Sequence, residues 1–474
     1  MEKYQQAQAL VQRFFLEQTE AAASFLEDLR AFTQGSFPWE FPGEPSPPED
    51  LDIIPAPLCY GIQHEMWVRR CAYTVNKAIR QILHRLLIAA PSLSPLAAWG
   101  LGKTTLGILE EWKRRRGDLG PINGRLDFFL ELPTMRSWLV EENRIKGGLR
   151  EIGDLLALFF RQSTLYRMLT GTGFALRLHY PFRERLRWFY QTYRQWKGKE
   201  ALPRPTLFLW TRSDHPQREE RCFRQLVEWF PQHYPPLRIR IADNQQGWCY
   251  RNGQLFYEEE PVEMVFRFEK LARIEDYAYV APLFEAYFDR RILLDTPPAA
   301  EVADNKMIQV LLSDPDYRSS LALSPAEQSL LSRILPPSRL LTAGEESYAL
   351  QERERLVLKT LTGAGGSGTV FGRDFSKARW EDQIKKLTGQ GLLQELRPPY
   401  VTLLPLPLQG RMTVLPVKYG FDIFTSGRLS YDIEGIAVRG KVIWEEDDLY
   451  ETINMGAKGP GQKRGKLLLP LLVL

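Results

Sequence analysis

Apolar residues recur at helical spacing through the first part of the chain. Within residues 1 to about 33 they fall every three or four positions, at Leu10, Phe14, Phe25 and Leu29. A stronger series between Met66 and Ile88 predicts a second helix. Prolines crowd the stretch from Phe37 to Pro57, which predicts a long surface loop. Residues 1–120 are therefore expected to form a helical N-terminal region with a proline-rich loop.

The pattern changes to short strands in residues 121–200. Arg125–Leu132 and Trp138–Glu141 are predicted to be neighbouring strands, joined by a turn at Pro133–Arg136. Helical periodicity then returns and continues to Lys197. This part of the chain is expected to fold as a pair of strands followed by helices.

Residues 201–300 have the pattern of an α/β layer. Thr206–Trp210 and Leu237–Ile241 are predicted strands, and an amphipathic helix from about Gln217 to Phe230 lies between them. A hairpin is expected over Trp248–Tyr257, because Asn252-Gly253 readily adopts positive φ at both turn positions.

The C-terminal part, residues 301–474, mixes strands and helices. Leu356–Leu358 and Thr369–Phe371 are predicted strands, and a helix from about Trp380 leads into a further strand at Gly391. The apolar end, Lys466–Leu474, is too short to cross a bilayer and is expected to be a closing buried strand. The fold class is therefore mixed, α+β or α/β.

Composition narrows the classes of partner. The chain has 474 residues, of which 44% are hydrophobic, which is enough for two or three packed lobes. Its net charge of +4 is dispersed, so a nucleic-acid partner is not favoured. No apolar run approaches the roughly 18 residues of a membrane span. The four cysteines form no CxxC pair, which argues against a zinc site and a disulfide framework and favours a protein of the reducing cytoplasm. None of the five histidines has metal-ligand spacing.

Oxygen donors cluster on the first pair of predicted strands. Asp127 and Glu141 lie near the ends of neighbouring strands, and Asn143 shares a face with Glu141 by strand periodicity. Such donors suit Mg²⁺. Arg125 would face the same side and could stabilise a phosphoryl group in transfer. Taken alone, this set is weak evidence, because charged residues at strand ends are usually solvated.

A glycine-rich loop follows a lysine-bearing strand near the C-terminus. Lys359 precedes a run of small residues that can let backbone amides approach phosphate, namely Gly363, Gly365, Gly366, Ser367 and Gly368. A simple glycine-rich hairpin turn is the alternative. Further on, Gln394 and Glu395 lie at the end of the strand that begins at Gly391, where an adenine-binding hinge would fit, although such a pair at a strand end is common.

A relaxed Walker A pattern occurs at Ala97–Thr104. A P-loop needs a strand running into it, whereas a helix and the segment Pro91–Pro95 precede this one. Ala97 also replaces the first glycine. We therefore expect Lys103 not to hold phosphate.

Taken together, these segments resemble the circularly permuted ATP-grasp family typified by the synthetase part of glutathionylspermidine synthetase. The family's Arg-x-Asp and Glu-x-Asn pairs match Arg125, Asp127, Glu141 and Asn143, and its Asn-Lys helix start matches Asn305-Lys306. In ordinary ATP-grasp ligases the lysine and glycine loop come first and the metal residues last; here that order is reversed. Gly435–Arg439 and Thr452–Asn454 resemble the closing strands.

The resemblance implies a fold and a site. It implies a circularly permuted ATP-grasp fold with a pre-ATP-grasp-like layer at 201–300 and a nucleotide-binding lobe at 301–474. Asp127, Glu141 and Asn143 would bind Mg²⁺, Lys306 and Lys359 would contact ATP, and the glycine loop would be a lid. Gly440 stands where the bifunctional enzymes of the family often have an acidic residue after the arginine. The family's N-terminal amidase, with its nucleophilic cysteine, is absent from this sequence. Glutathione and spermidine are therefore unsupported as substrates.

The resulting prediction is an ATP- and Mg²⁺-dependent carboxylate–amine ligase. It would join a small-molecule or peptide carboxylate to an amine through an acyl phosphate, with Arg125 as the catalytic residue. The alternative is a catalytically inactive ATP-binding regulatory or scaffold protein of the same fold.

Overall fold

The structure is a computed structural model. It describes residues 3–36, 54–145, 148, 150–211, 223–224, 226–228, 230–274, 276–363, 368–408, 411–427, 433–443, 466–469 and 471–473. All structural statements below concern these residues. Thr452–Asn454, part of the resemblance to the closing strands, lies outside them.

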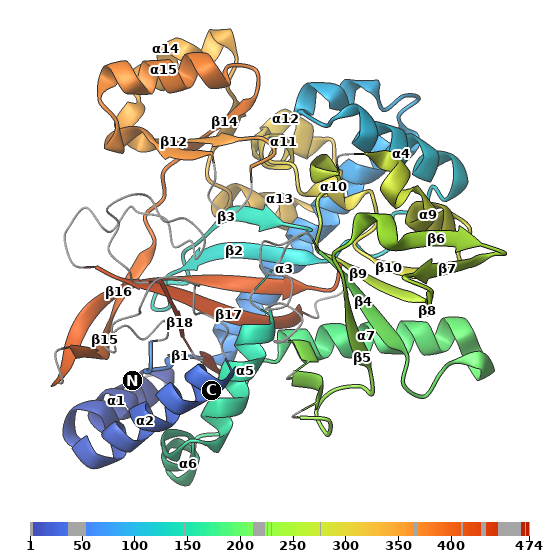
Figure 1. Cartoon of the computed structure of the whole chain (residues 1–474). Helices are drawn as coiled ribbons and strands as arrows, with labels where there is room; N and C mark the ends of the chain where they lie inside the picture. Colours follow the sequence, from blue (N-terminus) through green and yellow to red (C-terminus); the bar gives the residue numbers. More distant parts are fainter. Residues whose placement is uncertain are drawn as a thin grey trace.

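A six-stranded antiparallel sheet joins the early and late parts of the chain. Five strands follow one another in the order β18-β17-β16-β2-β3, and β15 also pairs with β16 (Figure 1). Their bounds are β2 Gly124–Leu130, β3 Ser137–Asn143, β15 Tyr400–Leu408, β16 Arg411–Thr425, β17 Ile433–Val442 and β18 Lys466–Leu469. The predicted strand pair around Pro133–Arg136 is confirmed as β2 and β3. The first strand of this sheet in the chain is thus paired with one that lies almost 300 residues later.

Helices of the N-terminal region pack against this sheet. The predicted first helix is two helices, α1 (Lys3–Glu17) and α2 (Thr19–Ser36). The second is confirmed as α3 (Ile62–Leu83), which continues as one π-helical segment, His84–Ala89. Figure 1 shows α3 crossing behind the sheet. The predicted proline-rich loop lies outside the described residues between 37 and 53.

The apolar end of the chain, predicted to form one closing strand, forms two strands. β18 pairs with β17, whereas β19 (Leu471–Val473) pairs in parallel with β1 (Leu58–Tyr60). The two pieces therefore belong to different sheets, and Pro470, which cannot donate to a ladder, separates them in the sequence.

The helical region before Lys197 consists of α5 (Arg150–Gln162), α6 (Thr164–Gly171) and α7 (Pro181–Lys197). The start of α7 packs closely against β17. Pro181 lies so near Gly435 that a Cβ added at this glycine would be 3.0 Å from the proline side chain. α7 then runs toward the second sheet (Figure 1).

The second sheet is parallel and has the order β10-β9-β4-β5. Its strands are β4 Thr206–Trp210, β5 Arg238–Ala242, β9 Met264–Arg267 and β10 Leu293–Asp295. Two of them confirm the predicted strands of the α/β layer; the helix expected between them lies largely outside the described residues. The hairpin is confirmed as β6 (Trp248–Arg251) and β7 (Gln254–Tyr257), which pairs onward with β8 (Glu260–Val262). Asn252 and Gly253 have φ of 53° and 73°, as the turn requires.

A third sheet forms a small lobe with its own core. Its order is β11-β14-β12-β13, from Ser338–Leu340, Gly391–Glu395, Leu356–Thr360 and Thr369–Phe371. Helices α14 (Glu346–Gln351) and α15 (Lys377–Leu387) cover it around the buried Trp380, whose indole donates to the Ala349 carbonyl at 2.9 Å. Figure 1 shows this lobe standing over β2 and β3. The strands predicted on both sides of the glycine loop are confirmed.

The remaining helices link the lobes. α4 (Lys103–Arg115) packs against α9 (Tyr277–Phe288), which also contacts β6 and β7. The helices that lead to the third sheet are α10 (Ala300–Ala303), α11 (Met307–Ser313), α12 (Pro315–Ser319) and α13 (Pro325–Ile334). No helix among the described residues is both long and apolar enough to cross a membrane.

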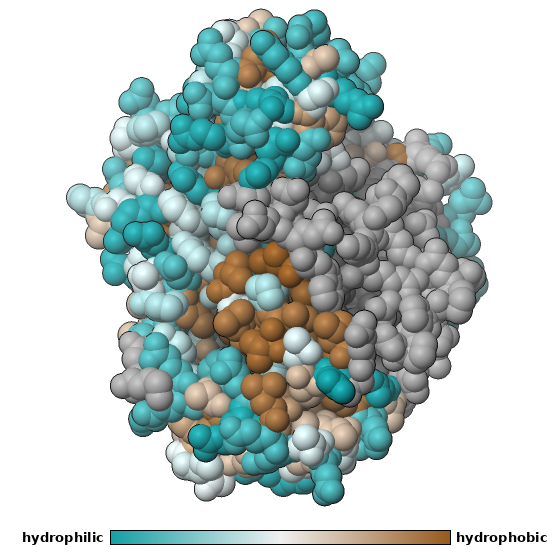
Figure 2. All heavy atoms as spheres, turned by 90° about the vertical axis from the view of Figure 1, so that its left-hand side faces the viewer, coloured by the Kyte–Doolittle hydropathy of each residue, from teal (hydrophilic) through white to brown (hydrophobic). Residues whose placement is uncertain are grey.

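The side of the molecule that carries the β15–β16 hairpin exposes apolar residues. Figure 2 shows apolar atoms gathered in the middle of this face. On the hairpin itself Leu403 is 55% exposed, and Val401 and Val414 are also exposed.

Candidate functional site

The predicted oxygen donors lie side by side on one face of the central sheet. Arg125 and Asp127 share a face because they are two residues apart in β2. Across the ladder, Glu141 pairs with Asp127 and Asn143 with Arg125. On the other side of β2, Asp422 of β16 pairs with Asp127. The sheet therefore gathers the four predicted residues and adds a fifth.

Two arginines and two aspartates form a compact charged group on this face. Arg125 Nε and Nη2 donate to the two oxygens of Asp127 at 2.7 and 3.0 Å. Arg439 Nη2 donates to Asp127 at 2.8 Å and to Asp422 at 2.6 Å. Burial raises the pKa of Asp422, although both arginines oppose that rise. The group is thus held by alternating charges in a largely dry environment.

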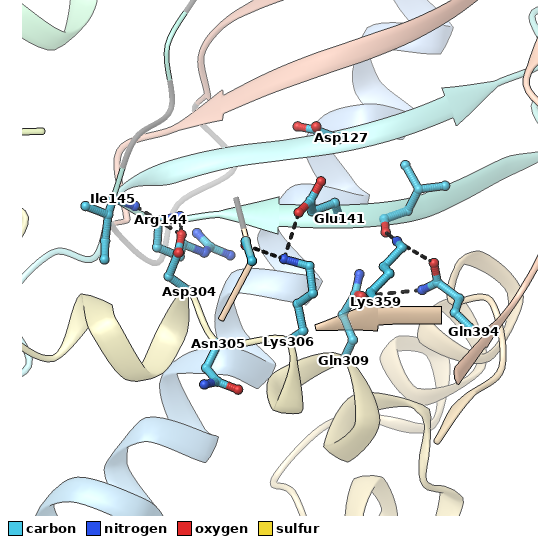
Figure 3. A network of polar contacts seen from close by, with 12 residues as sticks. Asp127, Glu141, Arg144, Ile145, Asp304, Asn305, Lys306, Gln309, Lys359 and Gln394 are labelled. Carbon is cyan, nitrogen blue, oxygen red and sulfur yellow. Dashed lines mark hydrogen bonds and ion pairs between the residues drawn. The ribbon is translucent and has the colours of Figure 1, made fainter. Parts of the chain in front are cut away.

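Lys306 connects the late part of the chain to β3. It lies between α10 and α11, and its Nζ is 3.0 Å from Glu141 Oε1 and donates to the Gly363 carbonyl at 2.8 Å. Figure 3 shows the two side chains pointing toward one another. Burial alone would raise the pKa of Glu141, but the ammonium groups of Lys306 and Lys359 lower that pKa to about 2. Glu141 is therefore a carboxylate at neutral pH.

Lys359 reaches the same strand from the third sheet. Its Nζ donates to the Val140 carbonyl at 2.9 Å and to Gln394 Oε1 at 2.7 Å (Figure 3). Only 8% of Lys359 is exposed. Burial lowers the pKa of Lys359 to about 8, which the Glu141 carboxylate opposes and the Lys306 charge reinforces. The ammonium is therefore easier to deprotonate than that of an ordinary lysine.

The structure thus brings the early donors and the late lysines together around β3. Gln394 contacts Lys359, whereas Glu395 pairs with Arg397 at 2.6 Å and points away from that lysine. Gly363 contacts Lys306, and Gly368, at φ 77°, accepts from the Thr360 amide at 3.0 Å. Gly365, Gly366 and Ser367 lie outside the described residues. The roles of all these residues stay predictions.

Three residues of this site were not among those predicted for it. Asp422 could have been noticed as a lone carboxylate in the apolar run Tyr419–Thr425. Arg439 falls in a segment that carries the family resemblance, but its contact with Asp127 depends on sheet register. Asp304 accepts from the Arg144 amide at 2.5 Å and pairs with Lys270 at 2.6 Å, so it ties the segment before Lys306 to the end of β3.

The donor set fits the preference of Mg²⁺ for hard oxygen ligands, with two carboxylates and one amide. In the structure Asp127 is engaged by Arg125 and Arg439, and Glu141 by Lys306. The Asn143 amide nitrogen is buried and has no partner among the described residues, so no bond through it fixes that amide. Across those residues no group of three or more His, Cys, Asp or Glu side chains is arranged to hold a metal. Asp127, Glu141 and Asn143 would supply three oxygen donors, and Mg²⁺ usually takes its remaining ligands from phosphate and water.

The Walker-like segment lacks the surroundings of a P-loop. Lys103 is the first residue of α4, and the short 3₁₀ helix Ser94–Trp99, not a strand, precedes it. This agrees with the expectation that Lys103 does not hold phosphate.

The chain matches no sequence-family profile and no curated protein sequence. Among solved structures it is similar to a glutathione synthetase-like effector from Globodera pallida in its apo form. The identity is 13% and the TM-score 0.59, and the match covers 97% of this chain and 100% of the other.

Two further structures are more distant. A protein named for gamma-glutamylcysteine synthetase from Methylobacillus flagellatus gives 11% identity and a TM-score of 0.40, over 73% of this chain and 80% of the other. D-alanyl-alanine synthetase A from Vibrio cholerae gives 10% and 0.29, over 57% and 89%.

The likeness to the effector shows the fold over almost the whole chain. The mixed α/β class and the relation to synthetase-like folds are therefore supported. The circular permutation, the metal and the nucleotide stay predictions.

Proposed function

We propose that the protein is an ATP-dependent carboxylate–amine ligase of the ATP-grasp type. The observation that carries this proposal is the convergence of Lys306 and Lys359 on β3, beside Asp127 and Glu141. Lys306 Nζ is 3.0 Å from Glu141 Oε1, and Lys359 donates to the carbonyl of the preceding residue, Val140, at 2.9 Å. Cations beside oxygen donors are what a triphosphate with its metal requires.

Different residues of the site would hold different parts of the nucleotide. Asp127, Glu141 and Asn143 would hold Mg²⁺, which supplies charge neutralisation to the phosphates when bound. Lys306 and Lys359 would bind phosphate oxygens, and the Gly363–Gly368 loop would close over them. The Gln394–Glu395 segment would form the hinge beside the adenine. Because Asp127 and Glu141 are engaged by cations, binding would require these ion pairs to rearrange.

The reaction would proceed in two displacements. A carboxylate oxygen of the acid attacks the γ-phosphorus, the bond to the bridging oxygen breaks, and ADP leaves. The amine nitrogen then attacks the carbonyl carbon of the acyl phosphate, phosphate leaves, and the nitrogen loses a proton to give the amide. Arg125 would stabilise the phosphoryl oxygens in transfer. We propose a small-molecule or peptide carboxylate and an amine as the substrates.

The test is ADP release in a screen of acids and amines with Mg·ATP. We expect release that requires both partners and falls at least about 100-fold in Asp127→Asn, since the loss of a charged ligand removes several kcal/mol of stabilisation. Asp118→Asn, an exposed carboxylate outside this site, is the matched control. Release that never depends on both an acid and an amine would contradict the ligase.

One observation favours the alternative of an inactive ATP-binding protein. Asp127, a proposed metal ligand, is already paired with two arginines. An inactive ATP-binding protein would be stabilised by Mg·ATP but would release no ADP with any pair of acid and amine. Thermal stabilisation and ADP release, measured on the same protein, therefore separate the two functions.

The lowered pKa of Lys359 predicts a pH dependence. Below about pH 8 the side chain is charged in the free protein, and above it the charge is lost. Bound phosphate favours the charged form, so affinity for Mg·ATP should fall by up to about tenfold per pH unit from pH 8 upward.

Binding titrations between pH 7 and 9.5 measure this effect, with Lys359→Arg as the comparison, because arginine stays charged throughout. An affinity that is constant across this range in the unsubstituted protein would show that Lys359 does not contact the phosphates.

A further inference from the structure

A cavity of about 720 Å³ shares no lining residue with the proposed nucleotide site. It lies between the second half of α7, the segment after α4, the end of α9 and β10, and its volume is within the range of about 300–1,000 Å³ typical of small-molecule sites. Aromatic rings and arginines line it, among them Trp188, Trp196, Tyr287, Arg80, Arg116 and Arg290. None of its lining residues is a proposed metal or nucleotide residue.

The acidic groups of this cavity are already compensated. Asp118 accepts from Arg116 at 3.1 Å. Asp295 is ion-paired with Arg185 and also accepts from the Asn123 amide at 3.1 Å. Both carboxylates therefore have cationic partners, and they contribute little net negative charge to the cavity.

Two arginines of the cavity have no carboxylate partner among the described residues. Arg80 donates to the Gly120 carbonyl at 2.6 Å, which does not neutralise its charge. Arg290 is exposed and has no ion-pair partner among the described residues. The cavity consequently carries the positive charge of Arg80 and Arg290 and has aromatic rings in its lining. The Arg116 guanidinium carbon lies over one of these rings, 4.6 Å from the centroid of Tyr287.

The wall beside these arginines is held in an unfavourable backbone conformation. Arg290 and Thr296, near the two ends of β10, have φ of 58° and 67°. For a β-branched residue such as Thr296 this conformation is rare and costs free energy. The Arg267 guanidinium donates to the Thr296 carbonyl at 2.9 Å and so holds it. A cost that the surroundings maintain is typical of a shaped binding wall.

We infer that this cavity is a second ligand site, which binds an organic anion with a planar apolar body. Arg80 and Arg290 would pair with the anionic group of the ligand. The apolar body of the ligand would pack against the rings of Trp188, Trp196 and Tyr287. This inference does not depend on the proposed ligase function, because it uses different residues.

Two fluorescent probes of similar aromatic body test the inference on the full chain. Anilinonaphthalene sulfonate carries a permanent negative charge, and phenylnaphthylamine carries none. We expect one saturable site for the anionic probe. Arg290→Asn should weaken its binding about tenfold, while phenylnaphthylamine changes by less than about twofold. Asparagine tolerates positive φ, so this variant should fold.

A steric variant and two controls complete the experiment. Thr192 lines the cavity, and Thr192→Trp should weaken both probes at least about tenfold by placing an indole in the space that the probe body would occupy. Arg13→Asn, which removes an exposed charge in α1, and Lys359→Met, in the proposed nucleotide site, should leave both probes unchanged. Unsaturable binding, an effect of Arg290→Asn no larger than that of Arg13→Asn, or full binding to the Thr192→Trp variant would each overturn the inference.

Discussion

Lys359→Met is expected to abolish the stabilisation of the protein by Mg·ATP. Lys359 is a buried ammonium that joins the third sheet to β3, and with Lys306 it supplies the positive charge beside Glu141. Methionine keeps most of the length of the side chain and removes the charge. A hydrogen bond to a charged group is worth about 1.5–3 kcal/mol, and desolvation places a buried one at the upper end of this range, so affinity should fall about 100-fold.

Thermal unfolding with and without nucleotide measures the effect. At a ligand concentration about 100 times the dissociation constant, the unsubstituted protein should gain about 2.7 kcal/mol, and the variant almost nothing. Lys385→Met is the matched control, because Lys385 lies on α15 of the same lobe, is 64% exposed and pairs only with Glu381 among the described residues. A full nucleotide shift in Lys359→Met would show that these lysines do not form the phosphate site.

Local patterns predicted the elements that carry the site. Period-two alternation in β2 puts Arg125 and Asp127 on one face, and the Asn252-Gly253 pair fixes the hairpin turn. The strands on both sides of the glycine loop could also be predicted, since their apolar residues are bounded by loop residues. Each of these inferences needs only neighbours within a few positions.

Contacts between distant strands could not be predicted in the same way. Asp422 meets Asp127 only because β16 pairs with β2, and Arg439 reaches both only because β17 adds to β16 in one register. A shift of one residue would turn these side chains to the opposite face. No property of the Asp422 or Arg439 segments alone encodes that register, so the charged group became visible only in the folded chain.

The same limit applies to a second buried ion network. Arg185 of α7 lies 3.2 Å from Glu434 of β17 and is ion-paired with Asp295 of β10, while Arg150 of α5 reaches Glu434 at 3.1 Å. Periodicity identifies Arg185 as a residue on the inner side of a helix, where a charge is unexpected. Only the packing of α7 between the two sheets shows what compensates it.

Arg185→Met is expected to destabilise the protein by about 3–5 kcal/mol, because it leaves Asp295 and one oxygen of Glu434 buried without their cation. Denaturant unfolding followed by circular dichroism measures this loss. Arg187→Met is the matched control: Arg187 lies two residues further along α7, its side chain is 45% exposed, and its ion pair with Glu184 should be worth less than about 1 kcal/mol. If both variants unfold at the same denaturant concentration, the buried network does not hold α7 to the two sheets. A large loss in Arg185→Met that Glu434→Gln in the same chain partly relieves would show that the uncompensated carboxylate is its cause.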